Sequence, residues 1–254
     1  MSLQFSNTTT KGGIIQIVER NVSAGDAGIS GSATKLAEVT SDVNLGMAKA
    51  WSIIFTSNGT WQWDDTNHTS DYPIITTDLI SGQRDYAFLT DNNGNLVLDI
   101  YKVMVKQPGG LYKEIRPVDA QSDVDGTPFY DGVNVAGVPD IYDKTANGIF
   151  LDPIPNSSIY TTAADLEDGL KVYINREGSF FLTSDTTKKP GFAGLFHEYP
   201  ALFASYKYAC RNGLKNKNDL YNDMINMEAA MKKHYARRER DVQTRITACP
   251  VNSV

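Results

Sequence analysis

The sequence predicts an α+β protein in which N- and C-terminal helices form a bundle and an antiparallel β-sandwich or barrel-like domain is inserted between them. Two segments near the ends of the chain carry apolar residues three or four positions apart, a spacing typical of amphipathic helices. Between them, short runs of β-branched and aromatic residues alternate with turn formers, which favours strands. Apolar residues make up 41% of the chain and charged residues 21%, as in ordinary globular proteins.

These patterns divide the chain into four parts. Residues 1–60 are predicted as an N-terminal helical part, 61–187 as the inserted β-rich domain, 188–240 as a C-terminal helical part and 241–254 as a tail. The tail is too short and too polar to fold by itself.

The N-terminal part should hold two helices, at 13–22 and 33–55, separated by Gly, Ser and Asp residues that favour turns. The longer helix has a narrow apolar stripe, as expected in a helix bundle. Its members are Leu36, Val39, Val43, Met47, Ala50 and Ile54.

Eight short runs in the middle of the chain are predicted as strands, and Asn147-Gly148 is predicted to join two of them in a tight antiparallel hairpin. Several short strands with such turns are typical of a sandwich or a small barrel. The runs are 74–77, 85–89, 96–106, 112–118, 141–145, 149–153, 170–176 and 180–183.

The C-terminal part should hold two more helices. The first, 195–212, has Leu202, Phe203, Tyr206 and Cys210 on its predicted apolar side, and Pro200 either begins this helix or kinks it. The second begins near Asn218, and its early acids and late bases match the helix dipole. Its predicted apolar stripe comprises Leu220, Met224, Met227, Met231 and Tyr235.

Charge is distributed unevenly along the chain. Of the 24 basic and 30 acidic residues, 10 and 5 fall between Pro200 and Arg245, which leaves 14 and 25 elsewhere. An acidic body with a basic end suits contact with an acidic partner or with phosphates, although solvated helix ends explain it equally well. The N-terminus lacks a secretory pattern and no apolar run reaches about 18 residues, so we expect the chain to stay in the cytoplasm where it is made.

Motifs that carry chemistry are missing from the sequence. It has no nucleophile elbow, phosphate-binding loop or HExxH motif, and His68, His197 and His234 are scattered. Cys210 and Cys249 lack metal-site spacing, and we expect one buried thiol and one in the tail. The sequence therefore predicts a structural protein, not an enzyme, without cofactor or metal.

Two local clusters of residues could form a metal site and a sugar-binding surface. Asp64, Asp65, Asn67 and Asp71 offer oxygen ligands that Ca²⁺ would accept, but without the spacing of an EF-hand loop, so turn and capping roles are favoured. Trp61 and Trp63 could form a platform for sugar rings. Tryptophans at alternate positions more often anchor a strand in a core.

Several short segments carry a family resemblance through their order along the chain. They are GIIQIVERN (13–21), VTSDVN (39–44), WQWDDTN (61–67), LISGQRDY (79–86), IFLDPIP (149–155), KPGF (189–192), LFHE (195–198) and YKYA (206–209). In this order, over nearly its whole length, the chain resembles the head-to-tail adaptor proteins of short-tailed bacteriophages. None of these segments is diagnostic by itself.

The resemblance implies a helical domain with an inserted β domain and a virion ring of twelve copies under the portal protein. It also implies tail or nozzle proteins attached below, and a channel through which double-stranded DNA leaves without sequence-specific contacts. Arg237, Arg238, Arg240 and Arg245 are the candidate portal-contact tail, because similar adaptors insert C-terminal extensions into the portal. Acidic residues facing the channel would avoid retarding the genome.

Two other classes remain open at this stage. The first is a β-sandwich module of a tail fibre or surface assembly that binds carbohydrate or protein through Trp61 and Trp63. The second is a cell-wall or polysaccharide hydrolase, which would need a carboxylate pair in a cleft. Ring symmetry separates the adaptor from the fibre module, because fibres are usually trimeric.

Overall fold

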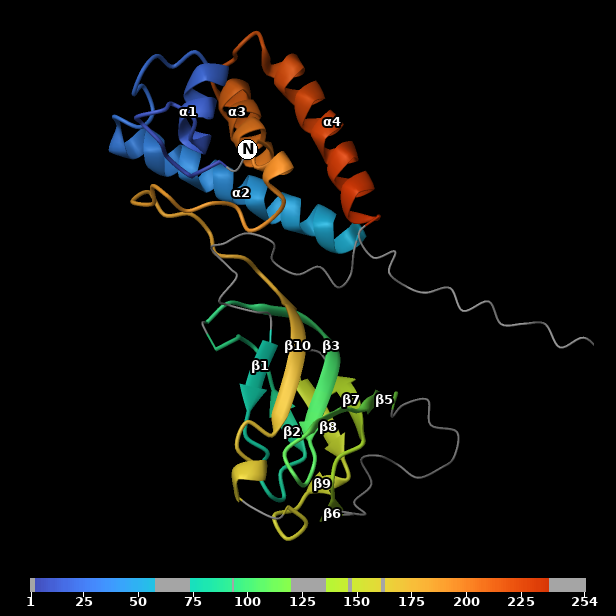
Figure 1. Ribbon diagram of the computed structural model, residues 1–254. Helices are drawn as coiled ribbons and strands as arrows, with labels where there is room; N and C mark the ends of the chain where they lie inside the picture. The colour runs from blue at the N-terminus through green and yellow to red at the C-terminus, as the bar shows by residue number, and fades with distance from the viewer. Residues whose placement is uncertain are drawn as a thin grey trace, which may run out of the picture. The chain divides into compact units, whose positions relative to one another are not determined.

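A computed structural model describes residues 3–57, 74–92, 94–119, 136–145, 148–160 and 163–237 (Figure 1). The chain is a mixed α+β protein, as its sequence predicts, and it divides into two compact units. The helical unit combines residues 1–61 with 180–254, and the strand unit comprises 62–179. The strand unit is thus an insertion in the helical one.

Four α-helices lie in the described part of the helical unit, and each predicted helix is confirmed. Pro200 lies in the first turn of its helix, where a missing N–H costs no helical hydrogen bond, so it begins this helix. A 3₁₀ turn at Gly194–Phe196 precedes it, which explains the later start than predicted. The helices are α1 (Ile14–Asn21), α2 (Ala33–Ser57), α3 (Tyr199–Arg211) and α4 (Lys217–Tyr235).

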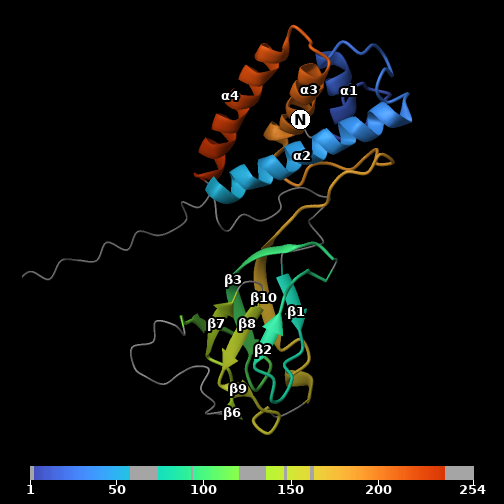
Figure 2. The same ribbon diagram turned by 180° about the vertical axis from the view of Figure 1, so that it is seen from behind.

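Helix α3 packs against the other three helices, with α1 and α4 on opposite sides of it in both views (Figures 1 and 2). Gly46 permits the close approach of α2, because a Cβ there would lie 3.1 Å from Pro200 Cα. Arg211 donates two hydrogen bonds to the Asp42 carboxylate, at 3.2 and 2.6 Å, and this bond raises the pKa of Arg211. The α2 stripe from Val39 to Ile54 forms part of the core.

The buried face of α3 matches the predicted one only in part, because Leu202 is buried, whereas Phe203 and Tyr206 are half-buried. Cys210 is exposed, so the expectation of a buried thiol there is wrong, and Cys249 lies outside the described residues. Small side chains occupy several of the buried positions, where α3 contacts the other helices closely. The buried residues of α3 are Tyr199, Pro200, Ala201, Leu202, Ala204, Ser205 and Ala209.

The segment 180–188 belongs to the helical unit, and the prediction of a strand at 180–183 is wrong. Asn44 holds it by accepting the Phe181 N–H and donating to the Phe181 carbonyl, both at 2.9 Å. The Phe181 ring stacks on Phe5 with centroids 4.7 Å apart, and the Phe5 N–H donates to the Lys188 carbonyl. A side-chain amide and the N-terminal segment thus supply the partners that a neighbouring strand would give.

The described part of the strand unit contains two four-stranded sheets, in the orders β1-β10-β3-β4 and β2-β8-β7-β5, and one pair, β6-β9. Most neighbours are antiparallel, as predicted, but β5 with β7 and β6 with β9 are short parallel pairs. The strands are β1 (Ile74–Thr77), β2 (Asp85–Ala87), β3 (Val97–Lys106), β4 (Tyr112–Glu114), β5 (Arg116–Pro117), β6 (Ala136–Gly137), β7 (Ile141–Thr145), β8 (Gly148–Asp152), β9 (Ile154–Pro155) and β10 (Leu170–Arg176).

The predicted pairing of β7 with β8 is confirmed, with a shifted register. Thr145 pairs with Gly148, so Gly148 begins a strand instead of occupying the predicted turn, and residues 146–147 lie outside the described ranges. Apolar residues from both four-stranded sheets share one core, including Val103 and Val172 of the first sheet and Leu151 of the second.

A buried ion pair also stabilises the strand unit. Arg176, at the end of β10, is 1% exposed and donates to the Asp91 carboxylate at 2.7 Å. The same carboxylate accepts the backbone N–H of Asn95, which closes the loop before β3. Removing either charge would leave the other buried without its partner, which typically costs about 3–5 kcal/mol.

We predict that Asn44→Ala loosens the 180–188 segment. Two hydrogen bonds are lost, which should lower the free energy of unfolding of the helical unit by about 2 kcal/mol. Guanidinium unfolding followed by helical ellipticity measures the change. Asn226→Ala, on the exposed side of α4, is the control for the higher helix propensity of alanine. Equal unfolding midpoints for the two variants would contradict the role of Asn44.

We also predict a specific alkaline loss of stability in the strand unit. Burial raises the pKa of Tyr160 to about 12 from its ordinary 10.0. The folded state therefore keeps the phenol proton between these pH values while the unfolded state loses it, so this contribution is complete below pH 10 and disappears through pH 12. Tyr160→Phe should lose less stability than the wild type between pH 8 and 11.5 in urea unfolding, whereas Tyr221→Phe should follow the wild type.

Candidate assembly interface

The C-terminal end of α4 is a basic surface formed by Lys232, Lys233 and His234 in the last turn, followed by Arg237. All four side chains are exposed, and the Arg237 N–H donates to the His234 carbonyl at 3.2 Å. Of the four arginines predicted to contact a portal, only Arg237 is described. Arg238, Arg240 and Arg245 lie outside the described residues.

Aromatic contacts fix this basic end against the segment before α3. Tyr235 is fully buried and its hydroxyl accepts the Ala193 N–H at 2.9 Å. The Phe196 ring packs edge-on against His234, with centroids 5.3 Å apart. These contacts hold the last turn of α4 in a defined position, and its positive charges oppose the partial negative charge of the helix C-terminus.

A hydrogen bond in the middle of α4 supports the same anchoring. The Tyr199 hydroxyl, on α3, donates to the Glu228 carboxylate at 2.8 Å. Burial and this bond raise the pKa of Tyr199, so the phenol stays protonated at physiological pH. Met224 and Met231 pack on the same side of α4, and the predicted apolar stripe of this helix is confirmed, with Met227 half-buried.

A second surface of the helical unit is an apolar groove between the outer face of α2 and the segment 180–184. Its cavity volume is 750 Å³. Three large apolar side chains are open to solvent there: Leu45 is 54% exposed, Phe180 40% and Leu182 63%. Such a cluster is typical of a surface that another molecule covers. The groove is lined by Ala37, Thr40, Ser41, Asn44, Leu45, Ala48, Phe180, Phe181, Leu182, Thr183 and Ser184.

Sequence reasoning missed this groove because 180–183 was predicted as a strand, whose partners would have covered it. One signal was present: Leu45 follows Val43 by two residues in α2, so it points about 200° away from that core position. A large apolar residue on the outer face of a helix indicates a contact beyond the helix's own core.

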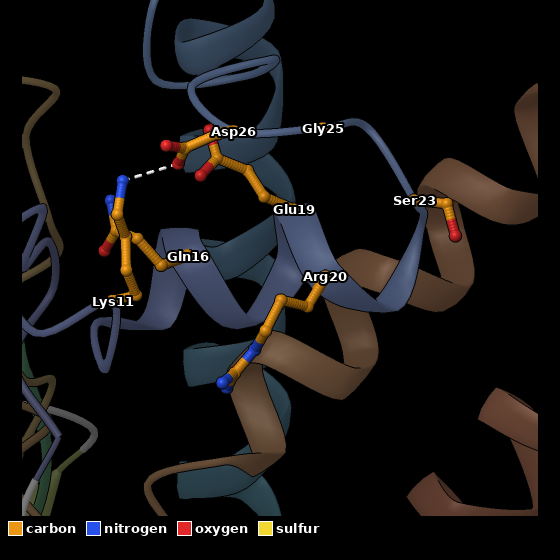
Figure 3. A pocket seen from close by; sticks show the side chains of 7 residues that line it. All are labelled: Lys11, Gln16, Glu19, Arg20, Ser23, Gly25 and Asp26. Atoms are coloured by element: carbon orange, nitrogen blue, oxygen red, sulfur yellow. Dashed lines mark hydrogen bonds and ion pairs between the residues drawn. The ribbon is translucent and has the colours of Figure 1, made fainter.

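A third hollow, of 590 Å³, lies beside α1 and the loop that follows it (Figure 3). Several of its polar side chains make contacts within the chain. Glu19 accepts hydrogen bonds from the Ile29 and Ser30 N–H groups and from the Ser30 hydroxyl. Lys11 pairs with Asp26 across the hollow, and Arg20 points away from this pair. The arrangement stabilises the loop after α1.

His197 has a structural role. It is fully buried, its Nδ1 accepts the Leu3 N–H at 3.0 Å, and its Nε2–H donates to the Phe192 carbonyl at 2.7 Å. Both nitrogens are thus used in holding the N-terminal segment to the turn before α3. Within the described ranges no group of three or more His, Cys, Asp or Glu side chains is placed to hold a metal ion.

Several residues singled out in the sequence lie outside the described ranges. They are His68, Trp61, Trp63, Asp64, Asp65, Asn67 and Asp71. In the part of the chain that the structure does describe, no helix is long and apolar enough to cross a membrane.

Comparison with known proteins finds no family model that matches the chain and no curated protein with significant sequence similarity to it.

We predict that Tyr235→Phe lowers the local stability of the last turn of α4. Loss of the bond to the Ala193 N–H removes about 1 kcal/mol of local stability while the ring keeps its packing. Hydrogen exchange should therefore speed up several-fold at the amides of Lys233 to Arg237. Tyr221→Phe, on the exposed side of the same helix, should leave these rates unchanged. Equal protection in both variants would show that packing alone holds this turn.

Proposed function

We propose that this protein is a structural head-to-tail adaptor of a short-tailed bacteriophage. Twelve copies would form a ring in the virion beneath the portal protein, with tail or nozzle proteins below. Double-stranded DNA would leave through the ring's channel. The role is one of assembly, without catalysis, cofactor or metal.

The observation that carries this proposal is the insertion of the strand unit into the helical unit. The chain leaves the helical unit near residue 61 and returns at 180, the organisation that the family resemblance implies. In finer detail, we propose that the four helices form a bundle and that the two four-stranded sheets form a sandwich or barrel-like domain. The core shared by the two sheets supports this description.

The surfaces of the helical unit support an assembly role. The apolar groove at Leu45 offers a contact for protein, and the end of α4 offers fixed positive charge. The four arginines from Arg237 to Arg245 would extend this charge toward the portal. The excess of acidic residues elsewhere would leave most of the protein without strong attraction for DNA phosphates.

The proposal is tested by native mass spectrometry of the purified chain, alone and mixed with the portal ring of its phage. We expect a complex of twelve copies, formed alone or only on the portal. A monomer or trimer that ignores the portal would overturn the proposal. It would favour the tail-fibre binding module, for which sugar binding at Trp61 and Trp63 is the next test.

The arginine tail has its own prediction. Replacing Arg237, Arg238, Arg240 and Arg245 together by serine should weaken portal binding at least tenfold at 0.1 M salt, and salt should affect the variant less than the wild type. Biolayer interferometry on immobilised portal rings measures both effects. A serine variant of Lys113 and Lys171, in the strand unit, is the control. Unchanged portal affinity in the arginine variant would exclude these residues as the portal contact.

A further inference from the structure

We propose that the apolar groove beside α2 binds residues 246–254 of the same chain. The groove is the surface around Leu45, Phe180 and Leu182 described above. Residues 246–254 follow the arginines that come after α4. The docking takes place within a single chain, so it does not depend on the adaptor role.

The groove suits an uncharged and extended occupant. None of the described residues that line it carries a charge, so a charged ligand would lose its hydration there without gaining a partner. The helical wall from Ala37 to Ala48 is about 16 Å long, a length that about five residues of extended chain cover. Hydroxyl groups of Ser41, Thr183 and Ser184 can bond to the backbone of a bound segment.

Residues 246–254 have the composition that such a groove favours. Their sequence is ITACPVNSV, which contains no charged residue, whereas residues 237–245 contain four arginines and two acids. Ile246, Val251 and Val254 offer apolar side chains, and β-branched residues together with Pro250 favour extended backbone. The segment therefore matches the groove in charge and in apolar surface.

The end of α4 lies within reach of the groove. In both views it lies beside the end of α2, and the two helices are in contact (Figures 1 and 2). The path from Ser57, the last residue of α2, to Leu45 is about 18 Å along the helix, and crossing the helix adds about 10–12 Å. Residues 238–246 cover about 30 Å when extended, so Ile246 can reach the near end of the groove.

The arginines on this path would meet favourable charge at the end of α2. Its last turn contains no basic residue, and the carbonyl groups at a helix C-terminus carry partial negative charge. Arg238 and Arg240, which come directly after the end of α4, would pass this region before the uncharged residues enter the groove. The order of charged and uncharged residues thus follows the order of the surfaces along the path.

Covalent linkage favours this segment over a separate molecule. Binding within one chain avoids most of the entropy cost of association, because a linker of this length gives an effective concentration on the order of millimolar. A weak apolar contact is therefore enough to fill the groove. A partner that uses the groove in the proposed adaptor would first have to displace residues 246–254.

The native Cys249 lies in the proposed docked segment and allows a direct test on the full-length chain. With Cys210 replaced by serine, Ser41→Cys places a second thiol in the groove, and we expect a disulfide to Cys249 of the same chain. Mass spectrometry of proteolytic fragments measures its rate. Asn226→Cys in the same background is the control and should react at least tenfold more slowly.

The control position makes the comparison strict. Asn226 is exposed, and it lies only about 16 Å along α4 from Arg237, nearer than the groove. A segment without a docking site would therefore reach Asn226→Cys at least as often as Ser41→Cys. Equal rates in the two variants, or a disulfide that forms only between chains, would overturn the inference.

Hydrogen exchange gives an independent test in the otherwise unchanged chain. Val251→Asp should speed up exchange several-fold at the amides of Phe180 to Ser184, because a buried carboxylate expels the segment from the groove. Val242→Asp, in the linking stretch, is the matched control and should leave these rates unchanged. Unchanged exchange in Val251→Asp would overturn the docking. The copy number in native mass spectrometry tests the adaptor role separately, because docking needs only one chain.

Discussion

The structure depends on how the helical unit holds the chain where it returns from the strand unit. A unit built from residues 1–61 and 180–254 pays the entropy of closing a loop of more than a hundred residues, so the returning segment must be fixed. Asn44 supplies that contact by pairing with both backbone groups of Phe181. The N-terminal segment adds the stacked Phe5 ring, worth about 0.5–1.5 kcal/mol beyond its burial.

The same anchoring produces the surface on which the proposed assembly relies. The returning segment is held by the Asn44 side chain and by the N-terminal segment. For this reason only some of its apolar residues are buried in the core. Phe181 is buried, but Phe180 and Leu182 on either side of it remain exposed beside Leu45. A structural constraint on the insertion thereby leaves an apolar groove open to solvent.

The contacts that hold α4 in place serve the proposed portal contact. Two hydrogen bonds, at Tyr235 and between Tyr199 and Glu228, hold α4 against α3 and the turn before it. The positively charged residues at the end of α4 therefore have a fixed position. A fixed base lowers the entropic cost of placing a basic tail against a partner. The buried His197 stabilises the same region by joining the N-terminal segment to the Phe192 carbonyl.

The sequence alone determined the α+β class, the four helices and most strands, because periodicity and turn chemistry act within a few residues. β1, β7 and β10 match their predicted bounds for this reason. Tertiary structure decided which face of α3 is buried, that 180–183 is not a strand and that Gly148 lies in one. It also created the α2 groove. These features depend on residues far apart in the chain, such as Asn44 and Phe181, whose contact no local pattern records.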